Sequence, residues 1–261
     1  MFISLVYICP KHSILNYEVF NTQLLKNMES VGNLSALFNC DKCFLNTFTG
    51  FYISEEERMH ICGDANQLHF KKGEMILKQG ATSTSIGFLH KGIVKFTYQK
   101  DAKKNYIMTI VSGPKLIGQA NLFFREKNIF SIIAVEDCDI CFLDSRKVLG
   151  ILENHGKFLL SLVERSSDMF QSSIFNFISL AHNHVHGRIA DILIFLWENV
   201  YKNSAYEFTL TRKEIAEFAA CSHENVISVL STYNKEGLIS FEGRKIIIRD
   251  LDKLKEISKN G

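Results

Sequence analysis

The sequence lacks any apolar run that approaches the roughly 18 residues needed to cross a membrane, so we expect no membrane-spanning segment. Its start, MFISLVYICP, is apolar but has neither a basic segment nor a small-residue cleavage site, and is a poor signal peptide. The seven cysteines are an odd number, and no secretion signal precedes them. We therefore expect a cytoplasmic protein in a reducing environment.

Net charge is also low. The 261 residues carry 30 Lys and Arg against 28 Asp and Glu, a formal net charge of +2. Residues 187–261 hold 11 of each kind, so overall charge gives no support to a nucleic-acid partner. The chain also lacks a nucleophile–base pair or a carboxylate dyad at a convincing spacing, which argues against an enzyme.

The stretch from Thr209 to Ile239 has the pattern of two helices joined by a tight turn. Thr211 is a good N-cap, and Glu214 three residues later can close a capping box. Ser222 caps a second helix, which ends before a glycine at position 237. The second helix has an apolar face of Val226, Val229, Leu230 and Tyr233, and a polar face of His223, Glu224, Ser228 and Ser231.

A polar face that begins in the first turn is what a recognition helix needs to reach base edges in a major groove. Gly243 then marks a turn between two short strands in LISFEGRKIIIRDL, a hairpin typical of the wing of a winged helix. An ordinary helix pair followed by a hairpin is the alternative, but the complete order of these features favours DNA binding. The residues expected to contact double-stranded DNA are Arg212, Lys213, Ser222, His223, Glu224, Asn225, Ser228, Arg244 and Lys245.

The segment from Leu68 to Leu143 contains short apolar runs separated by glycines and polar breaks, which predicts a small β-barrel or jelly roll. Successive side chains of a strand point to opposite faces. Cys138 shares a face with apolar residues and is expected to point inward. Cys141 lies on the other face and is expected to be an accessible thiol.

Gly156 to about His184 predicts one long helix, and Gly187 after it is the expected hinge. Its apolar residues recur at alternating steps of three and four, interrupted only by Ser167, which argues for a coiled coil and a homodimer. A helix that packs on its own β-domain is the alternative. The expected dimer interface comprises Leu160, Val163, Phe170, Ile174, Phe177 and Ala181.

These segments resemble, in the same order, the CRP/FNR family of bacterial transcription regulators. FKKGEMILKQG (70–80), IGFLHKGIVK (86–95) and GPKLIG (113–118) look like the family's cyclic-nucleotide-binding β-roll. Three residues depart from the pattern: Ala220 stands at the usual turn glycine, and His223 and Ser228 stand at two common arginines. The DNA-binding pattern is matched by Ser222, Glu224, Val226, Leu230, Gly237, Leu238, Ile239 and Gly243.

The resemblance implies an α+β fold. Its parts are a β-roll sensor domain at 36–155 (jelly roll, double-stranded β-helix), a long dimerisation helix at 156–186 and a winged helix-turn-helix at 187–261. Residues 1–35 show no clear period, and are either an extension or sequence upstream of a start at Met28. The implied function is a homodimeric transcription regulator of a palindromic operator, with RNA polymerase as a partner and a small-molecule or redox signal. The alternative is a ligand-binding or protein-interaction subunit whose winged helix does not bind DNA.

In the family's nucleotide-binding members, a helix N-terminus and an Arg hold the cyclic phosphate, and a Glu holds the ribose. Here Gln119 stands at the Glu position and Asn128 at the Arg position, with Arg125 three residues away. Gln119 is neutral, and Asn128 cannot neutralise a phosphate, so cyclic AMP is not expected to be the effector. The corresponding pocket would comprise Gly118, Gln119, Ala120, Asn121, Arg125 and Asn128.

The oxygen-sensing members hold an iron–sulfur cluster with four cysteines. Cys40 and Cys43 match the N-terminal pair, and Cys141 matches the cysteine on a later strand. The third N-terminal ligand falls near Thr49, so Cys9 or Cys62 would have to substitute. A metal or redox site at Cys40, Cys43 and Cys141 therefore stands beside the alternative that these cysteines are small hydrophobes.

Overall fold

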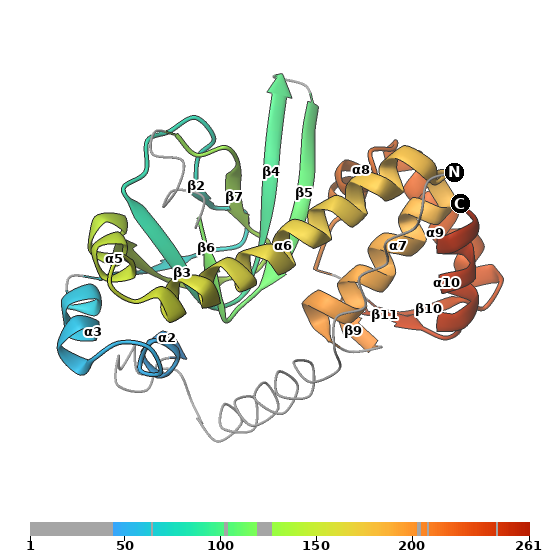
Figure 1. Cartoon of the computed structure of the whole chain (residues 1–261). Coiled ribbons are helices and arrows are strands. Elements are labelled where there is room, and N and C mark those ends of the chain that lie inside the picture. Colours follow the sequence, from blue (N-terminus) through green and yellow to red (C-terminus); the bar gives the residue numbers. More distant parts are fainter. Residues whose placement is uncertain are drawn as a thin grey trace, which may run out of the picture. The chain divides into compact units, whose positions relative to one another are not determined.

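The computed structural model describes residues 44–63, 65–101, 104–118, 127–202, 205–207, 209–243 and 245–261. The segment 1–35, whose role the sequence left open, lies outside these residues. Residues 43–261 form one unit, in which β-strands precede a long helix and a smaller domain of helices and short strands (Figure 1). None of the helices in the described ranges has the length and apolar character needed to span a bilayer.

Two four-stranded antiparallel sheets make up the β-roll that the sequence predicts. Gly92, with φ +101°, makes the turn between β3 and β4, where a Cβ would lie 2.5 Å from the Asp137 carbonyl oxygen. One sheet has the order β1 (Asn66–Phe70), β8 (Cys138–Asp144), β3 (Ser85–Lys91), β6 (Lys115–Ile117), and the other β2 (Met75–Leu77), β7 (Ser131–Ala134), β4 (Ile93–Asp101), β5 (Lys104–Ser112).

The inner faces of the two sheets enclose an apolar core. Leu89, Val94, Ile117 and Ile140 are fully buried there. Cys138 belongs to the same core, and burial raises the pKa of its thiol to about 11. The inward direction predicted for Cys138 from strand alternation is confirmed.

The outer face of the β1-β8-β3-β6 sheet is covered by helices α2 (Phe44–Thr49), α3 (Glu55–Cys62), α5 (Ser145–Leu152) and the start of α6 (Gly156–His182). Cys141 lies on this outer face, as alternation requires, but it is only 4% exposed beneath the helices. The prediction that Cys141 is an accessible thiol is therefore wrong. Strand alternation gives the face of a residue, whereas covering helices decide its exposure.

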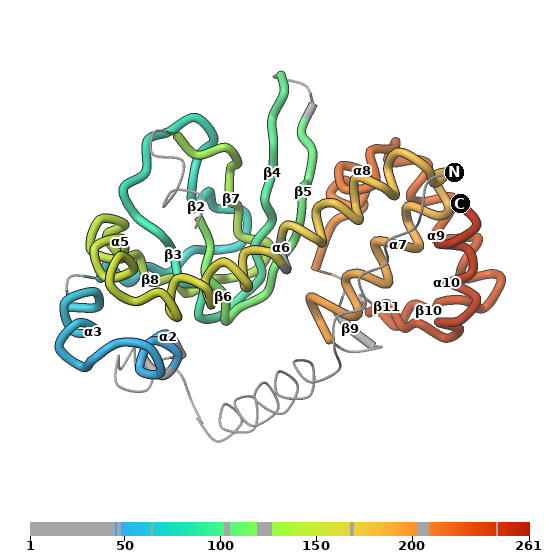
Figure 2. Tube along the Cα trace, viewed as in Figure 1, coloured from blue at the N-terminus to red at the C-terminus, as the bar shows by residue number. Residues whose placement is uncertain are grey.

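Helix α6 is the long helix expected from the sequence, and the chain turns back after it into α7 (Val185–Phe195) (Figure 2). The break lies at Asn183 and His184, which have extended backbone conformations. Asp191 in α7 fixes this corner by accepting hydrogen bonds from the Ser179 hydroxyl and the Asn183 side chain. Gly187, the expected hinge, is instead buried inside α7, where a Cβ would lie 2.9 Å from the Gly261 Cα.

The C-terminal domain has the winged helix-turn-helix architecture. A single core joins α7, α8 and α9 to the wing strands and also includes Ile93, Ile107 and Ile110 of the β-roll. The predicted hairpin pairs Ile239 with Ile248. Strand β9 adds to β11, which the sequence did not suggest. After α7 come the π-helical turn η2 (Leu196–Tyr201), β9 (Ala205–Glu207), α8 (Arg212–Ala219), α9 (His223–Lys235), β10 (Ile239–Glu242), β11 (Lys245–Ile248) and α10 (Leu251–Asn260).

Candidate nucleic-acid interface

The first helix of the pair, α8, begins with the predicted capping box. The Thr211 hydroxyl accepts a hydrogen bond from the Glu214 amide at 3.2 Å, and the Glu214 carboxylate accepts one from the Thr211 amide at 2.7 Å. Two amides at the helix start are thereby satisfied. Ile215, Ala216 and Phe218 bury the inner face of α8 against the domain core.

The second helix, α9, has one buried face and one exposed face. Val226, Val229 and Leu230 are between 0% and 3% exposed. Tyr233 is also buried, and its hydroxyl donates to the His186 carbonyl oxygen at 2.6 Å, which satisfies the polar end of the ring. The apolar face predicted from helical spacing is therefore confirmed, and it anchors α9 rigidly to the domain.

The opposite face of α9 is open from its first turn. The Ser222 hydroxyl caps the helix by accepting from the Asn225 amide at 3.2 Å. Hydrogen bonds from the Glu224 amide and the Ser222 hydroxyl hold the pKa of the Glu224 carboxyl below its ordinary value, so Glu224 is an anion at neutral pH. Of the nine expected DNA contacts, Arg244 lies outside the described residues; the other eight are exposed, namely Arg212, Lys213, Ser222, His223, Glu224, Asn225, Ser228 and Lys245.

The turn between α8 and α9 contains the alanine that replaces the usual glycine. Ala220 has φ +46° and ψ +48°, the left-handed conformation that costs a residue with a Cβ about 1–2 kcal/mol. Arg188 of α7 stabilises the turn, because its guanidinium donates to the carbonyl oxygens of Ala219 and Ala220 at 3.0 and 3.3 Å. The turn between the two helices is thus held by hydrogen bonds from a side chain of α7.

Ile227 also lies on the exposed face of α9, but it was not among the residues predicted to contact DNA. Its side chain is 45% exposed, although it is a large apolar residue. The signal was present in the sequence, because Ile227 lies three residues after Glu224 and four after His223, on the same face of a helix.

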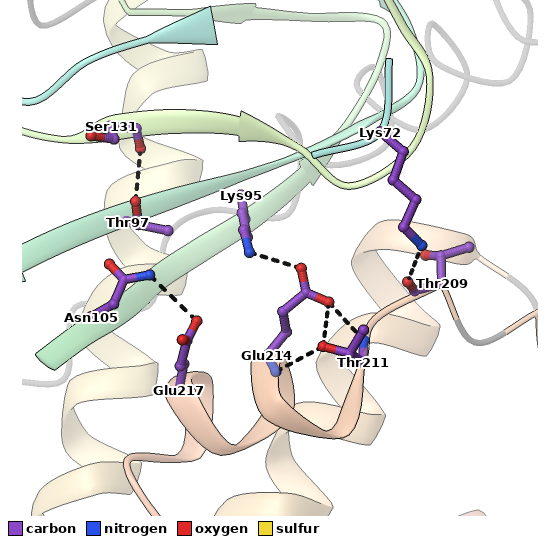
Figure 3. A network of polar contacts seen from close by, with 9 residues as sticks. All are labelled: Lys72, Lys95, Thr97, Asn105, Ser131, Thr209, Thr211, Glu214 and Glu217. Atoms are coloured by element: carbon purple, nitrogen blue, oxygen red, sulfur yellow. Dashed lines mark hydrogen bonds and ion pairs between the residues drawn. The ribbon is translucent and has the colours of Figure 1, made fainter. Parts of the chain in front are cut away.

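The first helix also contacts the β-roll through polar side chains (Figure 3). Lys95 of β4 donates to the Glu214 carboxylate at 2.8 Å, and Asn105 of β5 donates to Glu217 at 3.4 Å. Burial tends to raise the pKa of Glu214, but the hydrogen bonds and charge of Lys95 and the bonds from Thr211 outweigh it and lower this pKa. One carboxylate therefore both caps α8 and binds Lys95 of β4.

The expected effector pocket is described only at its two ends. Gly118 follows β6 with φ +76°, whereas Gln119, Ala120, Asn121 and Arg125 lie outside the described residues. Asn128 is 6% exposed, and its side-chain amide donates to the Lys78 carbonyl oxygen at 3.0 Å. Asn128 thus supports the backbone near residue 78.

The cysteine site predicted for a metal is described at only one of its three residues. Cys40 and Cys43 lie outside them, and Cys141 is buried among apolar side chains such as Phe88 and Leu143. Among the residues that the structure describes, no three His, Cys, Asp or Glu side chains come together as metal ligands. The metal site at Cys40, Cys43 and Cys141 therefore stays a prediction, beside the alternative of small hydrophobes.

The outer face of α6 carries apolar side chains that the domain does not bury. The start of the helix packs on its own β-domain through Phe158 and Leu162. The alternative interpretation, a helix packed on its own β-domain, is therefore correct for this part of α6. The structure also exposes Phe175 and Ile178, at 68% and 46%, which the predicted seam did not include. The six seam residues are all exposed: Leu160, Val163, Phe170, Ile174, Phe177 and Ala181.

Two family models match the chain. A cyclic nucleotide-binding domain matches residues 67–155, and a Crp-like helix-turn-helix domain matches residues 187–257. The cAMP-activated global transcriptional regulator CRP of Haemophilus influenzae is 24% identical over 177 residues, 66% of this chain and 79% of that protein. The protein of the same name from Pasteurella multocida is 26% identical over 178 residues, 66% and 85% of the two chains.

Solved structures share the fold. FixK2 from Bradyrhizobium japonicum superposes with a TM-score of 0.69 at 14% identity, covering 74% of this chain and 96% of that one. A CooA mutant from Carboxydothermus hydrogenoformans gives a TM-score of 0.65 at 19% identity, with coverage of 84% and 96%. The matched Crp-like helix-turn-helix domain and the CRP relatives favour DNA binding over a protein-interaction subunit. The chain therefore belongs to the CRP/FNR family of DNA-binding transcription regulators.

Proposed function

We propose that this regulator binds a palindromic operator as a homodimer and reads it with the exposed face of α9. The observation that carries the proposal is the polar first turn of a helix whose other face is 0–3% exposed. A rigid helix with an open polar N-terminal turn suits the major groove, because its side chains reach base edges without reorganisation. The chain acts without catalysis and works in the cytoplasm, with RNA polymerase as its partner.

The exposed apolar face of α6 supports a two-fold dimer. Apolar residues that recur every three or four positions are buried when two helices associate. Such a dimer would place two copies of α9 about one turn of DNA apart, about 34 Å, on two half-sites. Arg212, Lys213 and Lys245 would then hold phosphates, which positions the helix without reading sequence.

The effector that controls this protein is proposed to differ from cyclic AMP, the effector in the names of the CRP relatives. Gln119 lacks the carboxylate, and Asn128 lacks the charge, that would bind a ribose and a cyclic phosphate. The Asn128 amide is also engaged with the Lys78 carbonyl oxygen. These three observations argue for a different small molecule or a redox signal.

A random-site selection with the full chain tests the DNA-binding proposal. A carboxylate can accept from the cytosine amino group but repels phosphate, so Glu224→Ala should relax preference at one base pair per half-site by roughly tenfold. Lys245→Ala is the matched control: it should weaken all sequences alike and reduce the dependence on salt. An operator that keeps the same base preference after Glu224→Ala would show that α9 does not read it in this way.

A further inference from the structure

An apolar side chain stands in the middle of the polar face of α9. Among the side chains of 185–261 whose burial the structure describes, Ile227 and Phe241 are the large apolar ones that remain exposed, at 45% and 38%. Phe241 belongs to the wing strand β10, whereas Ile227 lies on the face that carries Glu224 and Ser228. Exposure of a branched apolar side chain to water is unfavourable, so a partner that covers it gains free energy.

The position of Ile227 restricts what can cover it. Ile227 lies three residues after Glu224, about 4.5 Å further along the helix axis. Helical side chains tilt toward the N-terminus, so Ile227 leans toward the turn that holds Glu224. Successive base pairs are about 3.4 Å apart. If Glu224 contacts one base pair, Ile227 faces a neighbouring one.

The chemistry of the major groove offers one apolar group there. Every base edge presents hydrogen-bond donors or acceptors, and thymine adds a C5 methyl group. Isoleucine has no donor or acceptor and would leave a polar edge unsatisfied. It therefore favours a methyl group over every other feature of the groove.

We propose that Ile227 is a specificity-determining residue that contacts the C5 methyl of a thymine next to the base pair read by Glu224. This inference rests on the DNA-binding function proposed above. It adds an apolar contact to a recognition face whose other residues are polar, and it assigns sequence preference to a side chain that forms no hydrogen bonds.

Uracil in place of thymine tests the inference, because it removes the methyl group and leaves the base-pairing edge unchanged. The selected operator would be made with each thymine of a half-site replaced singly by deoxyuridine. Binding of the full chain would then be measured by fluorescence anisotropy. We expect one position at which deoxyuridine weakens wild-type binding about three- to tenfold, the scale of one buried methyl group.

Ile227→Ala should abolish the difference between thymine and deoxyuridine at that position, and Ile227→Val should keep part of it. The matched control is Phe241→Ala, which removes the other exposed apolar side chain and should retain the full difference. The Ile227→Ala variant is expected to fold, because position 227 is exposed on a helix and alanine has a high helix propensity. Circular dichroism would check this.

The outcomes separate the two proposals. Specific binding with no deoxyuridine effect, or an effect that persists in Ile227→Ala, would overturn the role of Ile227 and leave DNA recognition intact. A selected half-site without thymine beneath α9 would do the same. Failure to enrich any sequence would overturn both proposals.

Discussion

The Lys95 ammonium of β4 and the Glu214 carboxylate of α8 form an ion pair of 2.8 Å, with side chains only 11% and 15% exposed. Glu214 is also the N3 residue of the α8 capping box. The start of the first DNA-binding helix is therefore tied to a strand of the β-roll.

Lys95→Met should destabilise the C-terminal domain by about 1–3 kcal/mol, because it leaves a buried carboxylate without its counter-ion. Trp197, the single tryptophan, packs against the core of that domain and reports its unfolding in urea by fluorescence. The control is Glu242→Gln, which breaks an exposed ion pair with Arg249 and should cost less than about 1 kcal/mol. Equal losses in the two variants would mean that the Lys95 pair contributes no more than a surface contact.

Charges on the outer face of α6 should prevent dimerisation. Phe170 and Phe177 are 67% and 69% exposed, and their replacement by glutamate would place two charges in an interface that is expected to be apolar. We expect a monomer by light scattering and the loss of operator binding. Asn176→Asp adds one charge beside Phe177 but outside the seam, and should remain dimeric. A dimer that survives both phenylalanine substitutions would place the interface elsewhere.

Ala220→Gly should stabilise the C-terminal domain by about 1 kcal/mol. Alanine at φ +46° has an unfavourable steric energy that glycine avoids. The free energy recovered in the folded state exceeds the conformational entropy that glycine adds to the unfolded chain. The rise in urea midpoint would again be followed at Trp197. Ala216→Gly is the matched control, because this position is inside α8 and the same change should destabilise the domain. An unchanged urea midpoint in Ala220→Gly would indicate that alanine causes no strain in this turn.

The stability of the β-roll should fall as pH decreases from about 6.5 toward 4. Burial lowers the pKa of His90 on β3 to about 4, although the nearby Asp139 charge opposes this. The unfolded chain therefore binds the proton more readily than the folded chain, and acid favours unfolding. Between pH 7 and pH 5 we expect a loss of about 1–2 kcal/mol that His90→Gln removes. Urea unfolding followed by circular dichroism at both pH values would measure it; equal pH dependence in both proteins would exclude His90 as the source.

Calorimetry should detect no saturable binding of cyclic AMP or cyclic GMP at micromolar concentrations. The reason is the absence of a carboxylate at Gln119 and of a guanidinium at Asn128. Titration of the same preparation with its selected operator is the control that the protein is competent. Saturable heat with either nucleotide would contradict the proposed change of effector.

Local features were determined by the sequence alone. The capping box at Thr211, the buried face of α9 and the turn at Gly243 are present as expected. Each depends on residues within a few positions of one another, so spacing and backbone preference suffice to predict it.

Contacts between distant segments were decided only by the tertiary structure. Alternation along β8 gave the face of Cys141, but α3, α5 and α6 bury it. The break between α6 and α7 lies at Asn183 because Asp191 binds the corner, and Gly187 is needed for close packing instead. Lys95 and Glu214 are 119 residues apart, and neither has a local pattern that names the other as its partner. Burial and long-range pairing depend on how whole elements pack, which periodicity within one element does not contain.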